Sequence, residues 1–389
     1  MITTFPRIRG NEDPIVLVAG FTGWGRDEFG GFLYWGGTSD IQEELKQQGY
    51  PTFTAGIGPY SSNWDRACEL FAIIKGGTVD YGEVHSKRFG HARYGRTFPG
   101  LYPQWSKENK IHIIGHSMGG QTARTLAQLL AEGSEEEQQG THPKELSPLF
   151  NGEEKNWIKS ISTISTPHNG STLVYGFQKY IPRMKQIFKL FSSVNQVGKK
   201  FYYDFKLDHW GLTMQEGESY NEYVKRVWKF NTIVKTTDFS EYDLSIEGAY
   251  ALNQWAKARP DIYYFSVGTK KTFSSPVTGY QIPQIKMNPL FTPFSLFMGR
   301  YTDRDHFSSI NENWWENDGI VNTFSMKGPV FGSKDPIIVP ETNYFLPTPG
   351  IWHYLGTMDD YDHMEIVSVG FKKARELYSQ LANLTGSLK

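Results

Sequence analysis

The 389-residue sequence is poor in three features that often define a protein class. It has one cysteine, Cys68, which excludes an intramolecular disulfide framework and a zinc site built from several cysteines. Its 40 basic and 41 acidic side chains give a formal net charge of −1, so no basic surplus points to nucleic acid or to an anionic membrane. Its longest apolar runs, near residues 15–19 and 291–298, are far shorter than the ~20 residues of a membrane-spanning helix.

The first residues also lack the basic segment followed by an apolar segment that marks a secretory signal peptide. Two interpretations stay open. The protein is cytoplasmic, or it is the mature form of a secreted enzyme in which Met1 replaces a removed signal. The near-absence of cysteine does not separate them.

Aromatic residues, in contrast, are abundant. The chain has 11 Trp, 22 Tyr and 26 Phe, which together make 15% of the sequence. Such side chains build cores, and they also line apolar ligand grooves. Charged residues at 21% and hydrophobic residues at 39% are typical of a globular chain.

Apolar segments of strand length alternate with segments of helical periodicity along most of the chain. This alternation predicts an α/β protein with a mostly parallel central sheet and helices on both faces. Residues 76–101 and 171–207 interrupt the alternation and are interpreted as insertions. The expected strands are 14–20, 50–57, 110–115, 158–166, 261–268, 335–339 and 350–356, and the expected helices include 40–48, 65–75, 117–131 and 370–383.

The strongest chemical signal is Gly115-His-Ser-Met-Gly119, which has the pattern G-x-S-x-G. The pattern alone recurs by chance, but here an apolar strand precedes it and a helical pattern follows it. This context predicts a nucleophile elbow, a sharp turn that exposes Ser117 at the carboxyl edge of the sheet. The alternative is an ordinary glycine-rich turn that opens a helix. His116 is interpreted as a packed side chain of the elbow.

A serine nucleophile requires a base and an acid that orients the base, and in this fold they follow in the order Ser, Asp or Glu, His. His363 lies before the last predicted helix, and Asp318 lies in a glycine-containing turn upstream. We therefore predict a triad of Ser117, Asp318 and His363. His353 is the rival base, and Asp359, Asp360 and Asp362 are the rival acids.

Acyl transfer also requires donors for the tetrahedral oxyanion. The backbone amide of Met118, directly after the nucleophile, is expected to supply one. The turn Ala19-Gly-Phe-Thr-Gly23 would supply the second from the amide of Phe21. An ordinary glycine turn explains this segment equally well.

Two histidines and two carboxylates form a candidate metal site. Asp65, His85, His91 and Asp243 would suit tetrahedral zinc. Their spacing is suggestive rather than diagnostic, because Asp65 also fits the first turn of a helix and Asp243 also fits a turn or a cap.

Several long strings, spread over nearly the whole chain, are shared with one enzyme family: Gly20-Phe-Thr-Gly-Trp-Gly25, Tyr34-Trp-Gly-Gly37, Gly90-His-Ala-Arg93, Gly119-Gly-Gln-Thr-Ala-Arg124, Tyr242-Asp-Leu-Ser245 and Glu316-Asn-Asp-Gly-Ile-Val321. On these strings the sequence resembles the bacterial thermoalkalophilic lipases and their staphylococcal relatives.

The resemblance implies one α/β-hydrolase domain over residues 1–389. Residues about 60–105 together with about 206–248 would form a zinc-binding subdomain, and residues about 171–205 would form a helical lid. It places the catalytic triad on Ser117, Asp318 and His363 and the oxyanion amides on Phe21 and Met118. It also makes the zinc structural, held by the four candidate ligands given above.

The implied activity is that of a secreted serine lipase on triacylglycerols and other water-insoluble esters, with aliphatic polyesters as a further hypothesis. The expected partner is therefore a lipid or other hydrophobic ester at an interface. A short-chain carboxylesterase and an acyltransferase are the alternatives within this chemistry. A non-catalytic binding protein on the same scaffold is the alternative outside it.

The sequence departs from the family at two places. Ala19 stands where the family usually has a histidine before the oxyanion-loop glycine. The family's calcium site keeps its glutamate here as Glu365, but its Asp-Pro pair is replaced by Gly370-Phe371, and Lys286 precedes Met287-Asn288. Because a hard dication needs several oxygen ligands, we predict no calcium site of this kind.

Overall fold

The computed structural model describes residues 5, 7, 9–176, 203–233, 236–303, 310–340, 345–370 and 372–389. Most of the predicted lid, about 171–205, therefore lies outside the described residues, as does Phe371. Within the part of the chain that is described, no helix combines the length and the apolar character needed to cross a membrane.

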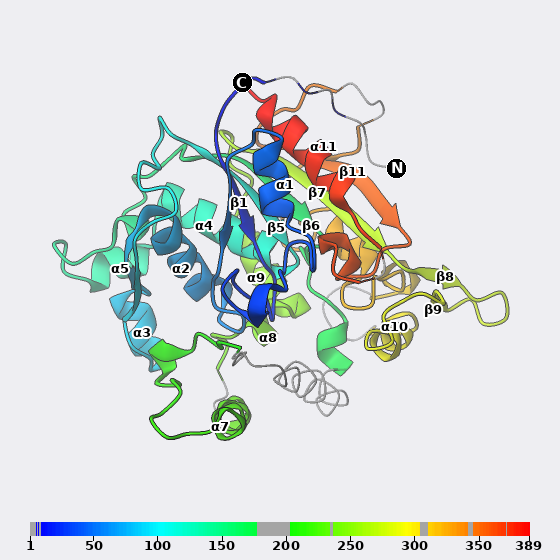
Figure 1. Cartoon of the computed structure of the whole chain (residues 1–389), viewed down its shortest axis with the longest axis horizontal. Coiled ribbons are helices and arrows are strands. Elements are labelled where there is room, and N and C mark those ends of the chain that lie inside the picture. Colours follow the sequence, from blue (N-terminus) through cyan, green and yellow to red (C-terminus); the bar gives the residue numbers. More distant parts are fainter. Residues whose placement is uncertain are drawn as a thin grey trace.

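A parallel sheet forms the centre of the molecule (Figure 1). Its order is β10-β11-β7-β6-β5-β1-β2, and every neighbouring pair is parallel. This confirms the predicted α/β class and its mostly parallel sheet. The strands are β1 (Ile15–Val18), β2 (Thr52–Ala55), β5 (Ile111–His116), β6 (Ile158–Ile164), β7 (Tyr263–Lys270), β10 (Ile337–Ile338) and β11 (Trp352–Asp359).

The central strands are nearly continuous apolar runs because helices cover both faces of the sheet. Alternate side chains of β1 enter different cores: Ile15 and Leu17 pack on one face, and Val16 and Val18 on the other. Helices α1 (Ile41–Gln47) and α11 (Arg375–Gly386) cover the first face. Helices α2 (Asn63–Lys75) and α4 (Met118–Glu132) cover the second.

The remaining elements lie around this frame. Two antiparallel pairs, β3 with β4 and β8 with β9, project from it. Their bounds are β3 (Gly77–Asp80), β4 (Tyr94–Phe98), β8 (Thr272–Ser274) and β9 (Gln281–Pro283), and the other helices are α3 (Glu83–Phe89), α5 (Glu135–Gly140), α7 (Tyr220–Ile233), α8 (Ser240–Asp243), α9 (Ile246–Trp255) and α10 (Thr292–Met298).

The first and last described segments meet at the amino edge of the sheet. Gly10 N–H donates to Gly386 O at 2.7 Å, and the Asn11 side-chain amide donates to Thr385 O at 2.9 Å. Asn11 Oδ1 also lies 2.9 Å from Nε2 of His112 at the start of β5. Parallel strands all end at the opposite edge, so the loops after β5, β7 and β11 converge there.

Candidate active site

Ser117 sits in a strained turn between β5 and α4. Its φ of 55° and ψ of −131° define a backbone conformation that residues other than glycine rarely adopt. The flanking glycines make this turn possible. A Cβ on Gly119 would lie 2.2 Å from Val18 O, and a Cβ on Gly115 would lie 2.6 Å from the carbonyl carbon of Gly119. The close packing of strand, turn and helix therefore holds Ser117 in the geometry that the G-x-S-x-G pattern predicts.

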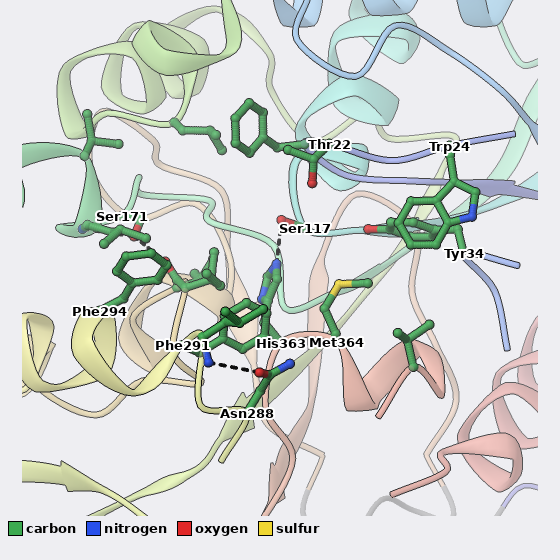
Figure 2. Close-up of a pocket in the computed structure, with 18 of the residues that line it drawn as sticks. Thr22, Trp24, Tyr34, Ser117, Ser171, Asn288, Phe291, Phe294, His363 and Met364 are labelled. Atoms are coloured by element: carbon green, nitrogen blue, oxygen red, sulfur yellow. Dashed lines mark hydrogen bonds between the residues drawn. The ribbon is translucent and has the colours of Figure 1, made fainter. Parts of the chain in front are cut away.

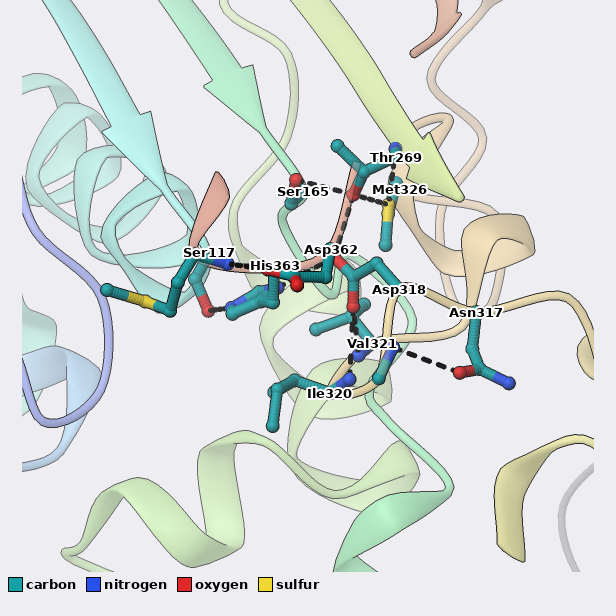
Figure 3. Close-up of polar contacts among 12 residues, drawn as sticks. Ser117, Ser165, Thr269, Asn317, Asp318, Ile320, Val321, Met326, Asp362 and His363 are labelled. Atoms are coloured by element: carbon teal, nitrogen blue, oxygen red, sulfur yellow. Dashed lines mark hydrogen bonds and ion pairs between the residues drawn. The ribbon is translucent and has the colours of Figure 1, made fainter. Parts of the chain in front are cut away.

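The structure brings Ser117, His363 and Asp318 together from three distant segments (Figure 3). His363 Nε2 lies 2.9 Å from Ser117 Oγ, and His363 Nδ1 lies 2.7 Å from Asp318 Oδ2. The Asp318 carboxylate can only accept a hydrogen bond, so His363 Nδ1 carries the proton. The lone pair of His363 Nε2 then faces the serine hydroxyl. This is the arrangement of a nucleophile, a base and an orienting acid.

Asp318 is fully buried, and donors surround its carboxylate. Oδ1 accepts from the backbone amides of Ile320 at 3.0 Å and Val321 at 2.9 Å. Oδ2 accepts from Thr269 Oγ1 at 2.7 Å as well as from His363. These bonds satisfy a buried carboxylate and fix its orientation toward His363. The sequence alone gave no signal for Thr269.

A buried ion pair stabilises the loop that carries His363. Lys271 Nζ forms a hydrogen bond with Glu365 Oε2 and lies 3.7 Å from Asp362 Oδ2. Asp362 Oδ1 in turn accepts from the amides of Met364 and Glu365, both at 3.1 Å. The two acids beside His363 thus bond to the loop itself. Asp362, a rival for the role of Asp318, has this structural position instead.

The rival histidines lie in other environments. His353 is buried at the start of β11, where its Nδ1 lies 3.1 Å from Tyr264 O of β7. His116 packs beside His363, with Nδ1 2.6 Å from the hydroxyl of Tyr34. Burial, and then the neighbouring His363, hold the pKa of His116 well below its usual range, so its ring stays neutral.

Two backbone amides near Ser117 are without a hydrogen-bond partner among the described residues: those of Phe21 and Met118. The amides on either side of Phe21 are bonded, Gly20 N to Tyr34 Oη at 3.1 Å and Thr22 N to Pro59 O at 3.0 Å. A Cβ on Gly20 would lie 2.6 Å from Ser117 Cβ, so only glycine lets this loop approach the nucleophile.

An apolar cavity of about 280 Å³ opens onto Ser117 and His363 (Figure 2). Aromatic and aliphatic side chains form most of its wall, and Figure 2 shows Phe291 and Phe294 reaching toward the triad from α10 and the segment before it. Such a cavity accepts an apolar group next to the nucleophile. Its wall includes Trp24, Phe29, Phe32, Tyr34, Leu173, Val174, Tyr203, Leu244, Leu290, Phe291, Phe294, Ile320, Val321, Met364 and Val369.

A second site, made of two histidines and two carboxylates, could hold a metal ion. Asp65 on α2, His85 on α3, His91 and Asp238 each offer one atom, and these atoms lie within 4.8 Å of one another. His85 Nε2 lies 3.3 Å from Asp65 Oδ1 and 3.2 Å from Asp238 Oδ2. His91 Nε2 lies 3.2 Å from Asp238 Oδ2 and 4.0 Å from Asp65 Oδ1.

These four residues fit a tetrahedral ion. Metal bonds of about 2.0–2.1 Å would separate tetrahedral ligand atoms by about 3.3–3.4 Å. Asp65 Oδ1 and His91 Nε2 are buried, yet neither has a hydrogen-bond partner, so both lone pairs are available. The other oxygen of Asp65 lies 3.0 Å from His209 Nε2, a contact that orients the carboxylate and that the sequence did not indicate.

The structure gathers Asp238, and not the predicted Asp243, with Asp65, His85 and His91. Asp243 ends α8, and its carboxylate accepts a hydrogen bond from the backbone amide of Asn63. Burial raises the pKa of the Asp243 carboxyl to about 7. The two aspartates are five positions apart, and only the turn into α8 decides which of them faces the histidines.

The comparisons with known proteins agree with this fold. Residues 11–388 match the family described as "Lipase-like, C-terminal domain". The chain is 39% identical over 369 residues to Lipase 1 of Staphylococcus aureus, covering 92% of this chain and 51% of that protein. The chain thus spans about half the length of this curated relative.

Solved structures are similar over nearly their whole length. EstA from Clostridium botulinum is 47% identical with a TM-score of 0.92, covering 100% of this chain and 91% of that one. Lipase 1 from Pelosinus fermentans is 46% identical with a TM-score of 0.86, covering 97% and 100%. The predicted resemblance is confirmed: the chain has an α/β-hydrolase fold and belongs to this lipase family.

Proposed function

We propose that the chain is a serine carboxylester hydrolase, a lipase that cleaves triacylglycerols and other water-insoluble esters. The observation that carries the proposal is the hydrogen-bonded series from Ser117 through His363 to Asp318, at the wall of an apolar cavity. Relatives that are named lipases support the same activity.

In this mechanism Ser117 Oγ attacks the ester carbonyl carbon while His363 Nε2 accepts its proton. The proton then passes from His363 to the departing alkoxide, which leaves as the alcohol. Asp318 stays ionised, holds the tautomer of His363 and stabilises the imidazolium. Water then attacks the acyl-enzyme while His363 accepts its proton, and His363 returns that proton to Ser117 Oγ as the acid leaves.

The negative charge on the former carbonyl oxygen needs donors that are in place before the reaction. The free amides of Phe21 and Met118 are the candidates, since both flank Ser117 and both lack another partner among the described residues. Ala19 begins this loop and supplies neither donor, so the loss of the family's histidine alters a neighbour of the proposed donor and not the donor itself.

We propose a structural zinc ion at Asp65, His85, His91 and Asp238. Four protein ligands leave no open position, so zinc here would join the insertion to α2 and take no part in the chemistry. No calcium is proposed near His363, because Lys271 already neutralises Glu365. Secretion, a lid at about 171–205 and action at a lipid interface are part of the same proposal.

The test compares wild type with Ser117→Ala on a butyrate and a palmitate chromogenic ester. The proposal expects cleavage of both esters and loss of nearly all activity in the variant. Cleavage of butyrate alone, with no gain on emulsified substrate, would favour the short-chain carboxylesterase. Ester products formed in the presence of an alcohol acceptor would favour the acyltransferase. No cleavage of either ester by wild type, even with detergent, would favour the non-catalytic binding protein.

A further inference from the structure

Residues 272–298 carry an exposed apolar surface that the proposed reaction does not use. Six large apolar side chains of this segment are exposed, and Val277 keeps 90% of its accessible area while Ile285 is fully exposed. Single exposed apolar residues are common on proteins, but a cluster of this size marks an interaction site. The cluster, here called the apolar rim, is Phe273, Val277, Tyr280, Ile285, Leu290 and Leu296.

The segments that carry the rim are held together, because the hairpin β8–β9 packs on α10 (Figure 1). Gln281 N donates to Gly299 O at 2.9 Å, and a Cβ on Gly299 would lie 2.0 Å from Gln281 O. Gln284 N donates to Lys271 O at 3.0 Å, which attaches the loop after the hairpin to the end of β7. These backbone hydrogen bonds therefore hold the segments that carry the exposed side chains in place.

The rim continues into the catalytic cavity. Leu290 is exposed on the surface and also forms part of the cavity wall. Its neighbours Asn288, Phe291 and Phe294 line the cavity, and Figure 2 shows Asn288 and Phe291 beside His363. A substrate phase in contact with the rim would thus lie next to Ser117.

The charge of the segment points to an uncharged partner. Residues 272–298 contain one charged side chain, Lys286, and no carboxylate or histidine. A single lysine is far from the polybasic cluster that recruits proteins to anionic lipid. Phe273 and Tyr280 are of the type that settles at an oil–water boundary.

We propose that the apolar rim docks the protein onto the surface of a triacylglycerol droplet and holds the cavity mouth against it. This rests on the proposed lipase function and adds the surface that meets the insoluble substrate. The side chains of Val277 and Ile285 enter the oil, where burial of apolar area supplies the binding free energy. The ester then reaches Ser117 without crossing water.

The test is the double variant Val277→Ser, Ile285→Ser. Its control is Val339→Ser, Leu346→Ser, which removes two other exposed apolar side chains, since Leu346 is 92% and Val339 66% exposed. Val339 follows β10, and Leu346 follows Phe345. Phe345 packs on His353 at the start of β11, away from Ser117. Neither pair touches the triad.

Binding is measured by flotation on triolein emulsion, with every protein also carrying Ser117→Ala so that the droplets stay intact. We expect the rim variant to bind at least about tenfold more weakly, because each lost side chain removes a large apolar area, and the control to bind like its parent. With Ser117 present, turnover of dissolved butyrate ester and the unfolding temperature should be unchanged in both.

Equal flotation of rim variant and control would overturn the proposal, as would an equal loss in both. Sedimentation that shows a wild-type dimer which the rim variant converts to a monomer would also overturn it and assign the rim to a second copy. Flotation does not depend on turnover, so an enzyme that cleaves no ester would refute the proposed function while leaving this test decisive.

Discussion

At the residue scale, the hydroxyl of Thr269 connects the proposed catalytic acid to the central sheet. Thr269 Oγ1 donates to Asp318 Oδ2 at 2.7 Å and lies 2.7 Å from Ser165 Oγ (Figure 3). The hydroxyl bonds to the same carboxylate oxygen as His363, so it helps fix the direction in which that oxygen meets the ring.

We expect Thr269→Val to lower kcat about tenfold with little change in KM, because a hydrogen bond to a charged acceptor is worth about 1.5–3 kcal/mol. Steady-state kinetics on a soluble butyrate ester measures this. Thr52→Val is the control, since Thr52, the first residue of β2, is equally buried but bonds to Tyr50 O. An unchanged kcat in Thr269→Val would show that the amides of Ile320 and Val321 hold Asp318 without the hydroxyl.

Some of the site residues could be predicted from the sequence, and others could not. Ser117, Asp318 and His363 could be proposed from motif, order and turn context, and the structure brings them together. Asp238 precedes the short helix α8 and Asp243 ends it, and no periodicity says which carboxylate faces the histidines. The sequence therefore offered no reason to choose Asp238 over Asp243. Thr269 lies in a strand, where nothing in the local sequence distinguishes it from a core residue.

At the scale of elements, β5, the elbow and α4 depend on glycines that allow the backbones to touch. Gly119 is in the first turn of α4, where a Cβ would lie 2.2 Å from Val18 O of β1. Neither backbone can yield easily, because β1 lies inside the sheet between β2 and β5. The pattern G-x-S-x-G is thus a packing requirement as well as a catalytic one.

Gly119→Ala should therefore destabilise the fold by about 3 kcal/mol, at the upper end for overpacking of a core. Thermal unfolding followed by circular dichroism measures the loss. Gly25→Ala is the control, since its Cβ would lie 3.2 Å from the end of the Glu28 side chain and, at 3.8 Å, in ordinary contact with Gly56 Cα. Equal unfolding temperatures in the two variants would contradict this account.

Elements within the regular alternation of strands and helices were predictable from sequence, and those within the insertion at 76–101 were not. The segment of α4 was expected as a helix over 117–131 because its apolar positions repeat with helical spacing, and the structure has it at Met118–Glu132. Residues 76–101 gave no periodicity, yet they form β3, α3 and β4. β3 and β4 lie outside the central sheet and are mostly not buried, so no apolar run marks them as strands.

At the scale of the whole molecule, the metal group links parts of the chain that are far apart in sequence. Asp65 is on α2, which packs on α4 and therefore on the helix that Ser117 opens. His85 is in the first turn of α3, His91 follows the end of that helix, and Asp238 precedes α8. An ion at this site would cross-link the insertion to the core, and binding energy at a structural site is folding energy.

We expect the purified protein to contain about one zinc per chain, and Asp238→Asn to lose it while Asp243→Asn keeps it. Elemental analysis of freshly purified, unchelated protein decides between the two aspartates. Chelation of wild type should lower its unfolding temperature, and added zinc should restore it. Metal-free wild type, or loss of zinc in Asp243→Asn alone, would refute the assignment to Asp238.

The meeting of the first and last described segments has a practical consequence. Gly10 and Asn11 bond to Gly386 and Thr385 at the amino edge of the sheet, whereas Ser117 and His363 lie at the carboxyl edge. A linker attached before Gly10 or after Leu388 would therefore leave from the side opposite the catalytic mouth. Tethering through either segment to a bead or a carrier would orient every molecule with its reactive face outward.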